Sequence, residues 1–399
     1  MNTLTLLADN GVLHKVALNQ AGEGVAPGTV LKSRVAYAAA HIVPRTLGNN
    51  TPGAPADIDW DATLGIRRRI YAQGLGVADA MDTAQRNLGL DFAGTKELIR
   101  RSAEVARECR GKLVVGVNTD HLEASHVSLQ EVIDAYKLQL DIAEEAGADA
   151  VLMASRHLAA AASDAKAYRS AYDAILKSTS RPVVLHWLGT AFDPALAGYF
   201  GSSEWQLAAD TVLHIIQENR EHVVGIKMSL LDWRSEVYLR ERLPDGVRMF
   251  TGDDYNYVRL IGGAEVYGSD SSAGGFDDAR GHSDALLGAF ASFPKAAAAA
   301  IQALDRGDAQ SYRRILEPTE ALSRHIFATP TYFYKTGVAF MAWLNGYQTA
   351  FQMVGGLHSA RSLPHLSRIV ELANDAQVFE CPELAAERWY GLLKLNGLK

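Results

Sequence analysis

Two features are scarce in this sequence, namely cysteine and long apolar runs. The 399 residues include two cysteines, Cys109 and Cys381, which are too few for a disulfide framework or a cysteine-based metal site. No apolar run approaches the roughly 18 residues that a transmembrane helix needs. The first ten residues carry neither the basic segment nor the cleavage pattern of a secretion signal. We therefore expect a cytoplasmic protein with no membrane partner.

An excess of positive charge is also missing. The chain has 39 lysines and arginines against 46 aspartates and glutamates, so its formal net charge is -7, and the charges are scattered along the sequence. Proteins that bind nucleic acids or anionic membranes usually concentrate positive charge. We therefore expect no nucleic-acid partner.

The sequence does contain a regular alternation of short apolar segments and helical patterns. Residues 4–18 predict a β-hairpin around Asp9-Asn10-Gly11, and the alternation begins near residue 33. Such alternation is typical of a parallel sheet, and eight repeats favour a closed α/β barrel, a (β/α)8 TIM barrel. The predicted strands are Val35–Ile42, Gly76–Ala80, Leu113–Val117, Ala150–Met153, Val183–Trp187, Val223–Lys227, Arg248–Thr251 and Glu265–Gly268.

Helical patterns fill the spaces between these strands and dominate the end of the chain. Ser128 with Glu131 forms a capping-box pattern that predicts a helix start. We divide the chain into an N-terminal β-hairpin extension (1–29), the barrel (30–281) and a C-terminal helical domain (282–399). The helices predicted in the last part are Ser283–Phe293, Pro294–Leu304, Ala309–Phe327, Thr331–Leu344, Leu366–Ala373 and Pro382–Leu393.

Lys227 is the most informative single residue, because it ends the apolar run 223–227. Burying a lysine is unfavourable, since loss of water disfavours the ammonium form. A desolvated amine loses its proton easily and can attack a carbonyl group to form a Schiff base. The alternative is a structural lysine whose ammonium reaches water from the strand end.

Polar residues follow the predicted strands, where the site of a (β/α)8 barrel forms. His186 ends the fifth strand next to Lys227, and we expect it to titrate near neutrality and to move protons. Asp254 and Thr119 are equally consistent with caps of the following helices. The residues predicted to bind substrate are Asp82, Thr83, Asp120, His157, Asp253, Ser269 and Asp270.

These residues resemble those of a known superfamily, the dihydrodipicolinate synthases and N-acetylneuraminate lyases. Gly225-Ile226-Lys227 corresponds to the Schiff-base lysine of that family, and Thr251-Gly252-Asp253-Asp254 corresponds to its motif after strand 7. The junction 144–151 and Phe293-Pro294 also match, so the resemblance covers most of the chain. It implies a class I aldolase on a (β/α)8 barrel, in a divergent, uncharacterised branch of the superfamily.

The departures from the family pattern concern the substrate. His186 stands where the family has a proton-relaying tyrosine, and only Thr83 remains of the loop that binds a 2-oxo-acid carboxylate. Asp82 in that loop would repel a carboxylate, and Ala191 replaces an expected arginine. We therefore expect a substrate other than pyruvate, and no synthesis of dihydrodipicolinate.

The sequence thus predicts a Schiff-base aldolase or lyase that acts on a carbonyl compound, such as a keto-sugar, without a metal or another cofactor. We expect a homo-oligomer, either a dimer or a tetramer. Two alternatives stay open, a non-catalytic metabolite-binding barrel and a metal-dependent sugar-processing enzyme. The second would use His121, His126, His157, His186 and Asp120, whose spacing is not that of a typical zinc site.

Overall fold

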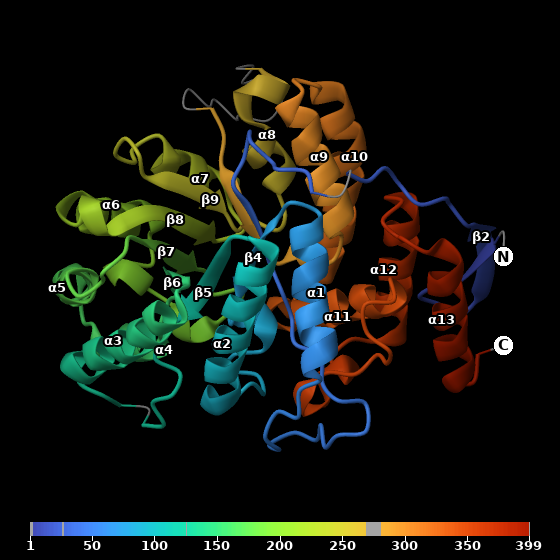
Figure 1. Ribbon diagram of the computed structural model, residues 1–399, viewed down its shortest axis with the longest axis horizontal. Coiled ribbons are helices and arrows are strands. Elements are labelled where there is room, and N and C mark those ends of the chain that lie inside the picture. The colour runs from blue at the N-terminus through green and yellow to red at the C-terminus, as the bar shows by residue number, and fades with distance from the viewer. Residues whose placement is uncertain (1–2, 26–27, 125, 269–280, 399) are drawn as a thin grey trace.

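A closed barrel of eight parallel strands forms the centre of the molecule (Figure 1). The computed structural model describes residues 3–25, 28–124, 126–268 and 281–398. Each barrel strand pairs in parallel with its two neighbours, which confirms the predicted fold class. The strands are β3 (Ala36–Ala39), β4 (Gly76–Asp79), β5 (Leu113–Val117), β6 (Asp149–Leu152), β7 (Val183–Leu188), β8 (Val223–Ser229), β9 (Arg248–Thr251) and β10 (Asp284–Leu287).

Helices surround the barrel on its outside (Figure 1). The predicted capping box is present at the start of α3, where Ser128 and Glu131 bond each other's backbone N–H groups. The helices that follow the strands are α1 (Trp60–Ala72), α2 (Phe92–Cys109), α3 (Leu129–Ala146), α4 (Arg156–Ala161), α5 (Ala165–Leu176), α6 (Trp205–Glu218), α7 (Trp233–Arg240) and α8 (Tyr257–Tyr267). No helix in these described ranges is long and apolar enough to span a membrane.

The end of the chain is helical, and it holds the N-terminal hairpin. The predicted hairpin is present as β1 (Thr3–Leu7) and β2 (Leu13–Ala17), and it lies beside the last two helices (Figure 1). Trp389 donates an indole hydrogen bond to the carbonyl of Thr5 at 2.7 Å. The α-helices that follow β10 are α9 (Pro294–Asp305), α10 (Ala309–Ile326), α11 (Tyr334–Leu344), α12 (Leu363–Asp375) and α13 (Pro382–Leu395).

The eighth strand is not where the sequence predicted it. Residues 265–267 form the last turn of α8, and β10 begins at Asp284, beyond residue 281 where we expected the barrel to end. The helix predicted for 283–293 is therefore wrong, because that segment contains β10 and a short 3-10 turn. A run of three or four apolar residues is too short for its periodicity to distinguish a strand from a helix.

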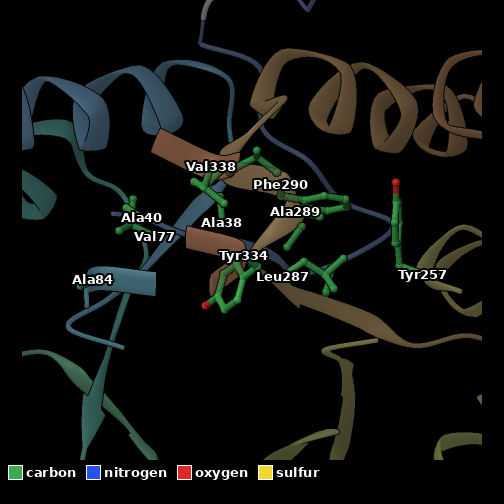
Figure 2. Close-up of a cluster of buried hydrophobic side chains, with 14 of the residues drawn as sticks. Ala38, Ala40, Val77, Ala84, Tyr257, Leu287, Ala289, Phe290, Tyr334 and Val338 are labelled. Carbon is green, nitrogen blue, oxygen red and sulfur yellow. The ribbon is translucent and has the colours of Figure 1, made fainter. Parts of the chain in front are cut away.

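Side chains of α11 pack against the carboxyl end of the barrel. Figure 2 shows Tyr334 and Val338 of α11 in one buried cluster with Leu287, Ala289 and Phe290, which lie in or just after β10. The ring of Tyr334 also stacks on Phe327, with the ring centroids 4.3 Å apart. The C-terminal helices therefore supply side chains to the same end of the barrel at which the strands present Lys227.

Candidate active site

Lys227 lies in the interior of the barrel, in the second half of β8. It pairs in register with His186 of β7 and with Phe250 of β9, and 8% of its surface is accessible. Within the described residues it makes no ion pair. Burial lowers the pKa of Lys227 to about 8, although the negative charges of Asp254 and Asp82 act in the opposite direction. Part of this amine is therefore neutral, and nucleophilic, near physiological pH.

Gly252 makes room for the side chain of Lys227. A methyl group at this position would lie 2.7 Å from Cε of Lys227 and 2.2 Å from Oγ of Ser229. Distances below 3 Å are too short for carbon atoms, so any larger residue would displace the lysine or the strand. The glycine of the motif after β9 thus has a steric role that its position in the sequence does not reveal.

The two aspartates after β9 lie in different surroundings, and the substrate-binding role of Asp253 stays a prediction. Asp253, predicted to bind substrate, accepts hydrogen bonds from the backbone N–H groups of Tyr255 and Asn256 and so holds the turn that leads into α8. Asp254, treated as a possible cap, is with Asp82 one of the two carboxylates whose charges act on Lys227. Its carboxylate accepts one hydrogen bond from the backbone N–H of Ala289, and burial raises its pKa to about 7.

His186 lies beside Lys227 as predicted, but its electrostatic environment differs from the expectation. The ring is 1% exposed, and Nε2 lies 3.2 Å from Oγ of Ser229. Burial, together with the charge of Lys227, lowers the pKa of His186 well below its ordinary value. The expectation that His186 titrates near neutrality is therefore wrong, because a buried imidazole next to an amine resists protonation.

The side chains of Asp82 and Thr83 each contact a side chain of α11. Nζ of Lys335 forms an ion pair with Asp82 at 2.9 Å, and Lys335 is fully buried. Burial lowers the pKa of Lys335 despite the attraction of Asp82. The hydroxyl groups of Thr83 and Tyr334 lie 2.8 Å apart. Asp82 is therefore neutralised by a lysine of the chain itself, which sequence analysis missed because 253 residues separate the two.

A pocket of about 220 Å³ lies among the loops that follow strands β4 to β7. It brings together Asp82, Asp120 and His157 as predicted, whereas Lys227 is not among its lining residues. The lysine lies deeper in the barrel, close enough to Asp82 for the two charges to interact. The lining residues are Asp82, Arg86, Asn87, Leu88, Asn118, Asp120, Met153, Ala154, Arg156, His157, Leu188, Phe192, Asp193, Pro194 and Tyr332.

Both arginines of this pocket are paired with aspartates of the pocket. Nε of Arg86, which is fully buried, donates to Asp120 at 2.8 Å, and Arg156 forms an ion pair with Asp193. Burial alone would raise the pKa of Asp120, but the Arg86 guanidinium outweighs it and holds that pKa below its ordinary value. Arg86 follows the predicted strand 76–80 closely, but nothing in the sequence distinguishes it from an exposed arginine.

The other predicted site residues either form local hydrogen bonds or lie outside the described residues. Nδ1 of His157 lies 2.9 Å from the hydroxyl of Thr119, which bonds to side chains instead of capping a helix. Ser269 and Asp270 lie outside the described residues, and the strand that they were expected to follow is the end of α8. In the part of the chain that the structure describes, His121, His157 and Asp120 do not form a group that could hold a metal ion.

Comparison with known proteins places this chain in a family. The family described as "Protein of unknown function (DUF993)" matches residues 4–398. The chain belongs to the DUF993 family. A comparison of this DUF993 member with curated proteins found no match.

Solved structures similar to this DUF993 member include several dihydrodipicolinate synthases. The Bacillus anthracis enzyme is 16% identical, with a TM-score of 0.59, and the match covers 86% of this chain and 98% of that one. The Aquifex aeolicus enzyme is 14% identical, with a TM-score of 0.60 and coverage of 87% and 99%. The 4-hydroxy-tetrahydrodipicolinate synthase of Methylacidiphilum fumariolicum is 19% identical, with a TM-score of 0.58 and coverage of 86% and 98%. These matches confirm the predicted likeness in fold.

Proposed function

We propose that this protein is a class I aldolase or lyase that makes or breaks a carbon–carbon bond through a Schiff base on Lys227. The observation that carries the proposal is the amine itself, which lies inside the carboxyl half of the barrel with its pKa lowered to about 8. The likeness in fold to dihydrodipicolinate synthases supports the same mechanism class.

Lys227 is a better nucleophile than the second buried lysine at this end of the barrel. Lys335 donates to Asp82 and to the carbonyl of Tyr332, so its nitrogen is already engaged by two acceptors. Lys227 makes no ion pair within the described residues, and its lone pair becomes available once its proton leaves. In this proposal Lys335 neutralises the charge of Asp82, and Lys227 reacts with the carbonyl group of the substrate.

The chemistry needs one group that gives and takes protons. The neutral amine of Lys227 adds to a carbonyl carbon, and water leaves once the oxygen is protonated, which gives an iminium ion. A hydroxyl group on the substrate carbon beyond the adjacent carbon–carbon bond then loses its proton, so that this fragment leaves as an aldehyde and the electron pair of the broken bond moves into the iminium. The resulting enamine takes up a proton, and hydrolysis of the iminium frees the lysine. Asp254 suits this role, since its pKa of about 7 allows both protonation states near neutrality. The neutral His186 and the hydroxyl of Tyr334 would orient the reacting groups.

The pairing of charges in the pocket supports an uncharged, hydroxyl-rich substrate, such as a keto-sugar. Arg86 is paired with Asp120, Arg156 with Asp193, and Asp82 with Lys335, so these cations are already bound to carboxylates of the protein. A substrate carboxylate would have to displace one of them, and breaking either of the two pairs with a fully buried cation, Arg86–Asp120 or Lys335–Asp82, would cost several kcal/mol. Paired carboxylates retain lone pairs that can accept hydrogen bonds from hydroxyl groups.

Reduction with borohydride tests the proposal. The protein is incubated with dihydroxyacetone or with pyruvate, reduced, digested and analysed by peptide mass spectrometry. We expect a stable adduct on Lys227 with the neutral ketone, a much weaker one with pyruvate, and none on Lys335. Reversible binding of keto-sugars with no adduct would instead indicate a non-catalytic binding protein. The expected dimer or tetramer stays a prediction, which sedimentation velocity checks.

A further inference from the structure

A second, larger cavity opens at the opposite end of the barrel, where the strands begin. Its volume is about 780 Å³, within the range of roughly 300–1,000 Å³ that small-molecule sites occupy. Its walls are mainly apolar and come from residues at or just before the starts of several strands, among them Val35, Val114, Val184 and Val224. The side chain of Val224 is 39% exposed, which is unusual for a residue of a central barrel strand.

Positive charge surrounds this cavity, against the overall charge of the protein. Five of the lining residues are cations and one, Asp149, is an anion, although the whole chain has a net charge of -7. Arg181 is paired with Asp149, and Arg248 is paired with Asp284. The cations are Arg107, Arg110, Lys112, Arg181 and Arg248, and they come from the end of α2, the segments that lead into β5 and β7, and the start of β9.

Three of these cations, Arg107, Arg110 and Lys112, lack a carboxylate partner within the described residues, and Arg107 donates a hydrogen bond to the carbonyl of Ala146 instead. Within the described residues, neither Arg110 nor Lys112 forms an ion pair, and both are exposed. Arg110 also has a left-handed backbone, with φ of 53°, at the end of α2, where glycine or asparagine is the usual residue. The chain therefore keeps an arginine at a position where glycine would have less backbone strain.

The floor of the cavity is aromatic. The rings of Tyr37 and Phe250 lie with their centroids 6.1 Å apart, tilted to each other. Gly76 and Gly225 leave room for these rings, since a Cβ on either would lie within 2.7 Å of a ring atom. Burial raises the pKa of Tyr37 to about 12, so its hydroxyl remains a hydrogen-bond donor at neutral pH.

We propose that this cavity binds a small organic anion that joins a phosphate group to a flat apolar ring. The phosphate would lie between Arg110 and Lys112, whose charges are available to it, and the ring would lie against Tyr37 and Phe250. Guanidinium and ammonium groups together are a common way to hold a phosphate. This proposal does not depend on the reaction at Lys227, because the cations of this cavity lie at the opposite end of the strands from the loops that line the first pocket.

Calorimetric titration of the full-length protein with phenyl phosphate tests the proposal. Two further titrations use inorganic phosphate, which represents the anionic group alone, and benzyl alcohol, which represents the ring alone. We expect phenyl phosphate to bind more tightly than inorganic phosphate, and benzyl alcohol to bind undetectably. Arg110→Gly and Lys112→Ala should each weaken binding about tenfold, because each removes one charge-assisted contact. Arg110→Gly should also raise the melting temperature, which separates loss of the site from loss of the fold.

Two controls locate the bound anion. Arg100→Ala removes a positive charge on α2 outside the cavity, and Arg156→Ala removes one at the carboxyl end of the barrel; both should leave the affinity within about twofold. The proposal would be overturned if either control lost as much affinity for phenyl phosphate as the cavity variants do. It would also be overturned if that affinity were unchanged in both Arg110→Gly and Lys112→Ala. A third outcome would also overturn the proposal, namely that the protein binds a single-stranded oligonucleotide but not phenyl phosphate, and that the same two variants weaken this binding. The surface would then be assigned to nucleic acid.

Discussion

Replacing Asp254 with asparagine should lower the pKa of Lys227 below its value of about 8. In the native protein the carboxylate of Asp254 favours the ammonium form of Lys227, and it does so against the effect of burial. Asparagine has the same shape, and its oxygen can still accept the hydrogen bond that Asp254 receives from the N–H of Ala289 at 2.9 Å. The substitution therefore removes charge while the backbone contact remains.

The size of the effect follows from the loss of one neighbouring charge. An opposite charge a few ångströms away typically changes a pKa by about one unit or more, so the pKa of Lys227 should fall to about 7. The neutral fraction of the amine at pH 7 would then rise from about a tenth to about a half. Formation of the Schiff base should become faster, whereas turnover should fall by about a hundredfold, because the acid–base group is gone.

The assay is an NMR titration of the Cε resonance of Lys227, assigned with the Lys227→Arg variant. It needs no substrate, so it reports the electrostatics of the site even if the proposed reaction is incorrect. The matched control is Asp253→Asn, because Asp253 has no resolved influence on Lys227 and should leave its titration midpoint unchanged. A midpoint that stays the same or rises in Asp254→Asn would refute the role assigned to Asp254.

The remaining predictions concern the nucleophile and stability. Lys227→Arg should abolish turnover and the borohydride adduct, since guanidinium stays protonated, and an enzyme assay with mass spectrometry checks both. Asp79→Ala should lower the free energy of unfolding by about 3–5 kcal/mol, because it leaves the fully buried Arg67 unpaired, whereas Asp57→Ala in an exposed pair should cost about 1 kcal/mol or less; urea titration measures both. Burial raises the pKa of Glu236 to about 8, so the folded state binds the proton more tightly than the unfolded state, and stability should fall by up to roughly 5 kcal/mol as pH rises from 4.5 to 8. Glu236→Gln should remove this slope in urea titrations at several pH values, and an unchanged slope would contradict the assignment.

Local sequence signals determined much of the fold. β5 and β9 were predicted with their observed bounds, and β7 and β8 within two residues, because each contains a short apolar run next to polar residues. The same reasoning placed Lys227 and His186 side by side, since neighbouring strands of a closed barrel align their ends. The prediction of the eighth strand was wrong, because the four residues of β10 are too few for a strand periodicity to be distinguished from the helical pattern around them.

The tertiary structure decided which side chains meet. Two adjacent aspartates are equivalent in the sequence, but after β9 Asp253 bonds the backbone of its own turn, whereas Asp254 bonds the N–H of Ala289 and influences the charge of Lys227. Lys335 and Tyr334 reach the site from a helix about 250 residues beyond their partners, and no local pattern encodes such a contact. The cationic cavity at the other end has the same origin, since its arginines become neighbours only when the barrel closes. Periodicity and burial are properties of short segments, whereas the pairing of charges depends on the packing of segments that are far apart in the chain.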